Sequence, residues 1–129
     1  MSANTDLVMN SLDQFAKGEI EAFLGNLHPE CVWLEPEGST LAGQWVGAQD
    51  ILTNLFMPLA ATWEWKHTAL IGIVEDGDTV YVRGVEEGRY LATGKSATSP
   101  FVHVLKIKDG KLASFEHIFD TAVFKACES

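Results

Sequence analysis

Apolar and polar residues alternate with a period of two through most of the second half of the chain. Three short turn sequences interrupt this alternation, at Asp76-Gly77, Thr93-Gly94 and Lys108-Asp109-Gly110. Glycine between alternating runs is typical of hairpin turns, because it adopts the positive φ that such turns need. The pattern therefore predicts a four-stranded antiparallel meander, with strands at about 63–75, 78–91, 96–107 and 111–120.

The turns also predict which residues lie opposite each other. The expected pairs are Val74 with Thr79 and Ala92 with Lys95 across two-residue loops, and Ile107 with Lys111 across a three-residue turn with a glycine bulge. Directly opposite residues share a face of the sheet. The shared face then carries three rows: His67, Glu86, Phe101 and His117; Ala69, Gly84, His103 and Phe115; and Trp65, Gly88, Ser99 and Phe119. A one-residue slip at the last hairpin would turn its strand over.

The first half of the chain shows mainly helical periodicity. Apolar residues recur at helical spacing up to Gly18, after Asn4 or Thr5 as a possible N-cap, and a second short helix follows at about 19–27. Residues 31–35 alternate as a short strand, and an amphipathic helix follows at about 47–58. Helices ahead of a twisted antiparallel sheet predict an α+β fold, in which three N-terminal helices cover the aromatic face.

Composition and charge narrow the classes of partner. The 129 residues are 47% hydrophobic, which favours one globular domain over residues 1–129. The net charge of −9 argues against nucleic acid and against an anionic membrane as partners. Without a signal-peptide pattern or a long apolar run, we expect a cytoplasmic protein. Cys31 and Cys127 are expected to be free thiols.

Several polar residues are expected among the aromatic side chains of the covered face. Glu35 follows Trp33 on the short strand, and desolvation there favours a carboxyl group that exchanges a proton near neutral pH. The alternative is a carboxylate at the rim that only caps the turn at Pro36. His67 and Glu86 are predicted neighbours, either as a polar pair of the sheet or as a tuned acid–base pair.

Two further histidines have open roles. His103 lies opposite Gly84 in the predicted register, which indicates either space for a ligand or a packing accommodation. His117 is expected about 10 Å from Glu86, two strands away, so that a ligand or water would have to bridge them. The spacing of the histidines contains no tight ligand motif, and we expect no metal site.

Aromatic residues surround these polar groups in the predicted rows. The mixture favours a cavity for a small hydrophobic molecule, because a buried polar group needs a partner. A flat and partly oxygenated ligand is expected. The predicted pocket residues are Trp33, Trp63, Trp65, Gly84, Phe101, Phe115 and Phe119.

Three sequence segments resemble the nuclear-transport-factor-2-like superfamily. Lys17-Gly18-Glu19-Ile20-Glu21-Ala22 is similar to its "GD-x-EA" helix break. Cys31-Val32-Trp33-Leu34-Glu35-Pro36-Glu37-Gly38 resembles the acid-Pro-x-Gly segment of the ketosteroid-isomerase-like and SnoaL-like branches. Asp109-Gly110-Lys111-Leu112, followed by Ile118-Phe119-Asp120, is similar to the closing segment of SnoaL-like and limonene-epoxide-hydrolase-like proteins. The resemblance implies a cone-shaped fold, with three helices over a strongly curved sheet.

The resemblance also implies roles for single residues. Glu35 falls where the isomerases place the carboxylate that shuttles a proton, and His103 where they place an acid that hydrogen-bonds the substrate oxygen. The first helix lacks the tyrosine that these isomerases use. Glu86 and His117 fall at the two acid positions of the epoxide hydrolases, but Gly84 replaces the arginine between them.

These observations predict a SnoaL-like protein with cofactor-free acid–base chemistry, of isomerase, polyketide-cyclase or hydrolase type, on a hydrophobic oxygenated compound. Glu35 is the expected proton shuttle, with His103, His117, Glu86 and His67 as donors or orienting groups. The alternative is a non-catalytic binder or a dimerisation module of the same fold. We expect a homodimer through the uncovered sheet face. Its apolar residues are Tyr81, Val85, Val102, Val104 and Ile118.

Overall fold

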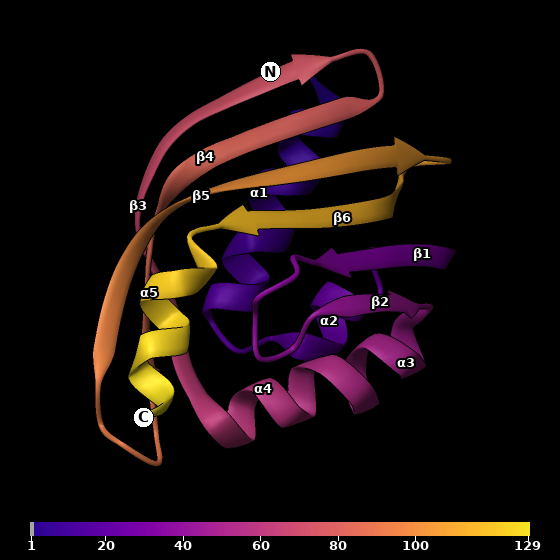
Figure 1. Cartoon of the computed structure of the whole chain (residues 1–129). Helices are drawn as coiled ribbons and strands as arrows, with labels where there is room; N and C mark the ends of the chain where they lie inside the picture. Colours follow the sequence, from indigo (N-terminus) through magenta and orange to yellow (C-terminus); the bar gives the residue numbers. More distant parts are fainter. Residues whose placement is uncertain (1) are drawn as a thin grey trace.

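The computed structural model describes residues 2–129 and contains one strongly curved sheet of six strands (Figure 1). The strands are β1 (Leu27–Glu35), β2 (Gly43–Val46), β3 (Trp63–Asp76), β4 (Thr79–Tyr90), β5 (Ser96–Lys108) and β6 (Lys111–Phe119). Their order across the sheet is β2-β1-β6-β5-β4-β3. The predicted four-strand meander is confirmed, and the first strand extends it by pairing with β6 in parallel. β2 was not predicted and forms the edge beside β1.

The helices lie mainly ahead of the meander in sequence, as an α+β fold requires. They are α1 (Ala3–Ala16), α2 (Ile20–Leu24), α3 (Ala48–Ile51), the π-helical turn η1 (Leu52–Phe56), α4 (Met57–Thr62), α5 (Thr121–Lys125) and the short 3₁₀ turn η2 (Ala126–Glu128). The three predicted helical regions and the α+β class are confirmed. The N-cap of α1 is Ser2, whose hydroxyl accepts from the Thr5 amide, instead of Asn4 or Thr5.

The third helical region is longer than predicted because the chain passes through Pro58 without ending the helix. Proline lacks the N–H that would bond one turn back. The π-helical turn at Leu52–Phe56 lies immediately before this proline. Leu55 and Phe56 are neighbours in sequence, and both are buried within this wider turn. The segment therefore brings two adjacent apolar side chains to the core.

The chain ends in a helix that the sequence did not predict. Asp120 caps α5 by accepting from the Ala122 amide, which gives this residue a structural role at the end of β6. Phe124 and Cys127 of this C-terminal segment are buried against Trp63. The segment thus adds a wall at the curved end of the sheet (Figure 1).

The first hairpin of the meander keeps one predicted part of its register. His67 lies opposite Glu86 and Trp65 opposite Gly88, as predicted. Near the turn, however, Thr79 pairs with Asp76 and not with Val74. Two irregularities in β3, on either side of Ala69, absorb the difference of two residues. The turn signal located the hairpin correctly, whereas the bulges carry no clear sequence signal.

The second hairpin is shifted by two residues from the prediction along its whole length. Tyr90 pairs with Lys95 across a four-residue loop, 91–94, instead of Ala92 with Lys95 across two residues. As a result Glu86 lies opposite Ser99, and Gly84 lies opposite Phe101 instead of His103. A shift of two residues preserves the face, so the predicted polar and aromatic residues still share the concave side.

In the last hairpin two differences of one residue each add up to a shift of two beyond the bulge, which preserves the face. Its turn has two residues, Asp109 and Gly110, both at positive φ as in a type I′ turn, instead of the predicted three. A bulge then leaves Ala113 unpaired between Leu112 and Ser114. Beyond it, His117 lies opposite His103 and not opposite Phe101.

The core fills the space between the concave sheet face and the helices. Trp33 of β1 stacks on Phe115 of β6, with ring centroids 3.8 Å apart and planes 13° from parallel. Phe23 of α2 and Phe56 of η1 contact the same tryptophan edge-on. This aromatic cluster joins helices to sheet and forms one end of the space described next. Among residues 2–129, no helix has the length and apolarity needed to cross a membrane.

Candidate functional site

A cavity that opens to solvent lies between the concave sheet face and the helices. Its wall is mostly aromatic and aliphatic, and its polar groups are three histidines, one carboxylate, three hydroxyls and a lysine. The lining residues are Leu12, Phe15, Phe23, Trp33, Glu35, Ser39, Thr40, Leu41, Leu55, Phe56, Leu59, Trp63, Trp65, His67, His103, Phe115, His117, Phe119, Thr121, Phe124 and Lys125.

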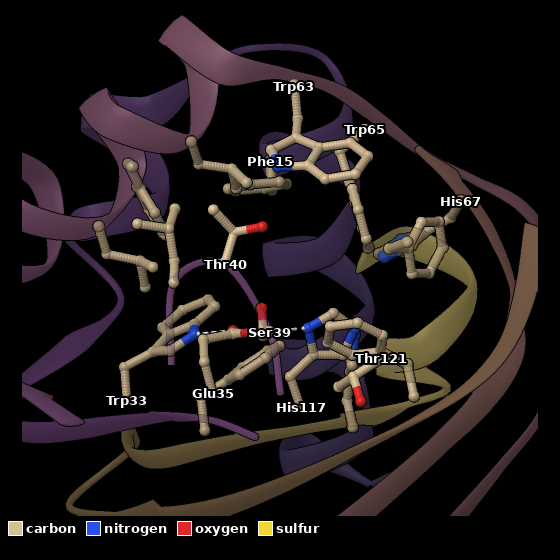
Figure 2. Close-up of a pocket in the computed structure, with 18 of the residues that line it drawn as sticks. Phe15, Trp33, Glu35, Ser39, Thr40, Trp63, Trp65, His67, His117 and Thr121 are labelled. Carbon is tan, nitrogen blue, oxygen red and sulfur yellow. Dashed lines mark hydrogen bonds and ion pairs between the residues drawn. The ribbon is translucent and has the colours of Figure 1, made fainter. Parts of the chain in front are cut away.

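Two carboxylates hold one imidazole between them at the floor of this cavity. His117 Nδ1 is 2.9 Å from Glu35 Oε1, and His117 Nε2 is 2.7 Å from Glu86 Oε1. Both ring nitrogens are therefore engaged in short contacts with acids. In Figure 2, Glu35 and His117 lie together on one side of the cavity, and Trp63 and Phe15 lie on the other.

A tryptophan fixes the second oxygen of each carboxylate. The indole N–H of Trp33 donates to Glu35 Oε2 at 2.7 Å, and that of Trp65 donates to Glu86 Oε2 at 2.9 Å. Indole is a donor only, so each of these carboxylate oxygens acts as the acceptor. The result is a continuous chain of hydrogen bonds from Trp33 through Glu35, His117 and Glu86 to Trp65, which we call the acid–imidazole chain.

The sheet topology explains how these residues meet. β1 runs parallel to β6 with Leu34 opposite Glu116, so Glu35 at the end of β1 lies beside His117. Glu86 lies two strands away on β4, yet it contacts His117 directly. The expected separation of about 10 Å was therefore wrong, because that value assumes a flat sheet. The sheet is strongly curved (Figure 1). On its concave face the side chains of Glu86 and His117 converge, although their strands are not adjacent.

The surroundings of His117 favour its charged form. Burial alone would lower the pKa of this imidazole, but the hydrogen bonds and charges of Glu35 and Glu86 outweigh burial and raise the pKa to about 9. His117 is therefore a cation at neutral pH and donates both N–H groups. Glu86 has no exposed surface. Its hydrogen bonds with the imidazolium of His117 and the indole N–H of Trp65 offset the free-energy cost of burying this carboxylate.

The other two histidines of the cavity are neutral. Burial lowers the pKa of His103 well below its usual value, and the nearby His117 and His67 add to this effect. Burial also lowers the pKa of His67, although the charge of Glu86 opposes it. His67 Nε2 is 3.8 Å from Glu86 Oε2, which is beyond hydrogen-bonding distance. The predicted His67 and Glu86 neighbours are thus adjacent in the sheet but not hydrogen-bonded.

Most of the residues predicted for the site lie around this cavity. Glu35, His67, His103, His117, Trp33, Trp63, Trp65, Phe115 and Phe119 contribute to its wall. Glu86 lies behind His117, and its carboxylate does not reach the wall. Gly84 and Phe101 are not part of the wall either. A Cβ atom on Gly84 would lie 2.7 Å from Phe101 Cε2, so the missing side chain makes room for this ring and not for a ligand.

The sequence patterns did not predict the residues at the rim of the cavity. Ser39, Thr40 and Leu41 belong to the loop between β1 and β2, and Thr121 and Lys125 belong to α5. Thr40 Oγ1 donates to Glu128 Oε2 at 2.8 Å, which connects the loop to the C-terminal segment. Neither the loop nor α5 has a periodic pattern in the sequence. Their place at the cavity follows only from the folded sheet.

One group of side chains in the structure combines residue types that can bind a metal ion. A ligand atom each from His67, Glu86 and His103 lies within 4.8 Å of the others. Ligands of a tetrahedral ion at about 2.1 Å are only about 3.4 Å apart. Both oxygens of Glu86 already accept hydrogen bonds, and the cationic His117 lies beside them. The donor set therefore does not suit a divalent cation as it is arranged here.

The comparisons with known proteins agree with this fold. Residues 8–115 match the SnoaL-like domain. An NTF2-like protein of Burkholderia thailandensis is 27% identical, with 100% of this chain and 99% of that chain covered and a TM-score of 0.92. An NTF2-like protein of Burkholderia pseudomallei is also 27% identical, with 98% of each chain covered and a TM-score of 0.90.

A third similar structure contains a small molecule. TerC, co-crystallised with polyporic acid, is 33% identical, with 99% of this chain and 100% of that chain covered and a TM-score of 0.85. The search of curated proteins found no significant match. These likenesses confirm the predicted cone of curved sheet and helices. Because the family match covers residues 8–115, the chain belongs to the SnoaL-like domain family, within the NTF2-like superfamily.

Proposed function

We propose that the cavity binds a small hydrophobic, oxygenated compound and that Glu35 transfers a proton on it, without a cofactor. The acid–imidazole chain carries this proposal. Glu35 is its only carboxylate on the cavity wall, and its side chain is 10% exposed. His117 and Glu86 lie behind Glu35 and hold it in one orientation. Such an arrangement is typical of a general base or acid with an orienting second group.

The lining supports an aromatic or polycyclic ligand. The wall consists mostly of aromatic rings, which favour flat apolar ligands through stacked and edge-on contacts. Its buried polar groups gather on the sheet side, where they can contact an oxygen substituent. TerC, which was co-crystallised with polyporic acid, shares 33% of its residues with this chain. We therefore include polyporic acid among the compounds to test.

The proposed chemistry is a proton shift. The Glu35 carboxylate accepts a proton from an acidic C–H or O–H group of the ligand, and the electron pair of that bond stays on the ligand. The same proton then returns from Glu35 to a second position, so that no oxidant or reductant is needed. Throughout, the His117 imidazolium remains hydrogen-bonded to Glu86, whose charge keeps the cation stable in the interior. Isomerisation, cyclisation and elimination all contain such a step.

The experiment begins with a thermal-shift screen of polyporic acid, steroid enones, terpene epoxides and aromatic ketones. A ligand at about 100 times its Kd should stabilise the protein by about 2.7 kcal/mol. Each hit is then incubated with the wild-type protein and with Glu35→Gln, and the products are followed by mass spectrometry and chromatography. Glu37→Gln is the matched control, because Glu37 is an exposed acid two residues away.

We expect conversion by the wild-type protein and by Glu37→Gln, and none by Glu35→Gln, which should still bind the ligand. Conversion by Glu35→Gln at the wild-type rate would remove Glu35 from the mechanism. A ligand that binds tightly and is never converted would favour the alternative function, a non-catalytic binder. The same series of measurements therefore separates the two functions.

The outer sheet face supports a second part of the proposal, a homodimer. The side chains of Tyr81 and Ile118 are 40% and 46% exposed there, and Val74 is 63% exposed. Val85, Val102 and Val104 lie between the charged residues of the same face and are half-buried. An apolar surface of this kind can pair with its own copy about a two-fold axis.

A further inference from the structure

Two histidines of the cavity make no hydrogen bond with any group of residues 2–129. Among residues 2–129, histidine side chains form hydrogen bonds only at His28 and His117. His103 is 3% exposed, and its Nδ1 is sealed from solvent without any partner. The His67 side chain is 18% exposed, and its Nε2 is 3.8 Å from Glu86 Oε2. Buried polar atoms in proteins nearly always have partners, so an unpaired imidazole pair requires an explanation.

The two rings are held firmly by aromatic contacts. His67 stacks on Phe101, with centroids 4.6 Å apart and planes 22° from parallel. His103 lies between Phe101 and Phe115, at 4.4 Å and 4.6 Å. The two histidine rings are 5.2 Å apart. We call them the histidine pair. Packing therefore fixes their positions, although no hydrogen bond does.

The chemistry of the histidine pair restricts its occupant. Each neutral ring offers one N–H donor and one nitrogen acceptor. A hydroxyl group accepts from one ring and donates to the other, whereas an ether or a ketone only accepts. A carboxylate would be repelled by Glu86. Two hydrogen bonds of about 2.8 Å to one tetrahedral oxygen span about 4.6 Å between the nitrogens. A ring nitrogen of His67 and one of His103 lie within 4.8 Å.

We propose that the histidine pair is a binding site for a hydroxyl group of the ligand, with His67 and His103 as its two hydrogen-bond partners. This inference rests on the proposed function, because it assigns a second contact to the same ligand. Both rings keep the positions that packing gives them, and the ligand oxygen reaches them from the cavity, whose wall includes both histidines. The pair binds and selects the ligand, whereas Glu35 transfers the proton.

The positions of Glu35 and the histidine pair restrict which ligands can contact both. Glu35 lies on β1, on one side of the His117 strand β6, and the histidine pair lies on β5 and β3, on the other side of β6 in the sheet order. A ligand that contacts both carries two oxygen functions or acidic positions on one hydrophobic frame. One of these is a free hydroxyl, phenolic or alcoholic. A compound whose hydroxyl is methylated should lose the contact.

The test compares 2-naphthol with 2-methoxynaphthalene, which has the same frame but cannot donate a hydrogen bond. Kd values are measured by calorimetry on the wild-type protein, His67→Phe, His103→Phe and the control His28→Phe, since His28 lies outside the cavity wall. We expect the wild-type protein and the control to prefer 2-naphthol about tenfold. The ratio should fall to about one in either cavity variant. Phenylalanine preserves the aromatic packing and removes the polar atoms.

A second measurement uses the wild-type protein alone, so that it does not depend on the folding of a variant. 2-Naphthol should shift the ring ¹⁵N resonances of His67 and His103, and 2-methoxynaphthalene should leave them unchanged. The proposal is overturned if both cavity variants keep the preference, or if these resonances do not move. It is also overturned if ZnCl₂ binds at one equivalent and loses binding in His67→Phe, which would show a metal site.

The two proposals fail in different ways. Equal affinity of the wild-type protein for both naphthalenes overturns the hydroxyl site and leaves the role of Glu35 untouched. Glu35→Gln should retain the tenfold preference, because Glu35 is not part of the histidine pair. If neither naphthalene binds and no compound of the screen is converted, both proposals are wrong.

Discussion

His117 and Glu86 come from strands that are not neighbours, yet Nε2 of His117 lies 2.7 Å from Oε1 of Glu86. β5 runs between their strands, and at the point opposite Glu86 it carries Ser99, a small residue. The curvature of the sheet closes the remaining distance. This contact places the fully buried carboxylate of Glu86 next to a cation. Glu35 and Glu86 therefore share one imidazole as a hydrogen-bond donor.

The first prediction concerns stability and pH. The folded pKa of His117 is raised to about 9 from an ordinary value of 6.5. Its contribution to stability is therefore complete below about pH 6.5 and is lost as the pH rises through about 9, a loss of about 3 kcal/mol. Urea unfolding between pH 6 and 10 should show this decline. A ¹⁵N titration that finds His117 neutral at pH 7 would contradict the prediction.

The second prediction concerns the donor to the buried carboxylate. Trp65→Phe removes the indole N–H from Glu86 and leaves the buried acid with one fewer partner. We expect a loss of about 1–3 kcal/mol in the free energy of unfolding. Trp63→Phe is the control, because Trp63 is buried in the same aromatic cluster and makes no side-chain hydrogen bond within residues 2–129. Equal losses in both variants would show that packing alone is measured.

The third prediction concerns the orientation of Glu35. Trp33→Phe removes the donor to Glu35 Oε2 and keeps most of the stacking on Phe115. Once a converted ligand is known, kcat should fall by about tenfold, whereas ligand affinity should change little. Trp45→Phe on the neighbouring strand is the matched control, since Trp45 lies opposite Trp33 and does not line the cavity. An unchanged kcat in Trp33→Phe would mean that His117 alone orients Glu35.

The fourth prediction uses two glycines of the sheet. A Cβ atom on Gly84 would clash with the Ala69 carbonyl and with the Phe101 ring. Gly84→Ala should therefore destabilise the fold by about 1–3 kcal/mol or more. Gly72 has no atom within 4 Å of such a Cβ, and Gly72→Ala should be neutral or slightly stabilising. Thermal unfolding of the two variants checks the difference. Similar melting temperatures would show that the Phe101 ring moves easily.

The fifth prediction concerns assembly. Ile118→Lys places a charge in the apolar part of the outer sheet face, where Ile118 is 46% exposed. If this face joins two copies, light scattering should show a dimer for the wild-type protein and a monomer for the variant. Lys17→Glu on α1, away from the sheet, should remain a dimer. A wild-type protein that is monomeric at high concentration would exclude the assembly.

The sequence was sufficient to predict the faces of the meander, but not the contacts on them. Period-two alternation decides which side chains are inward. At His67, Glu86, His103 and His117 the register is either unchanged or shifted by two residues, so these side chains appear on the predicted side. The contacts depend on bulges and on loop length, which have weak sequence signals. The pairs of His67 with Glu86 and of Trp65 with Gly88 were placed correctly as neighbours.

The contact of Glu35 with His117 illustrates the same limit. The two residues are 82 positions apart and meet through the parallel pairing of β1 with β6. A parallel pair leaves no local turn signal, because its strands are joined by a long connection. Lys125 and Thr121 were missed for a related reason, since the short helix that carries them has no periodic pattern. Long-range pairing therefore determined the part of the site that sequence patterns could not predict.

The bulge at Ala113 determines how this chain tolerates changes in length. Ala113 is the residue of β6 that has no partner on β5. Its deletion would restore regular pairing and leave both neighbouring pairs intact, with His117 still facing the cavity. Deletion of Glu116, three residues later, would turn His117 towards the outer surface. In an alignment of this family, gaps should therefore be frequent at the position of Ala113 and rare at the position of Glu116.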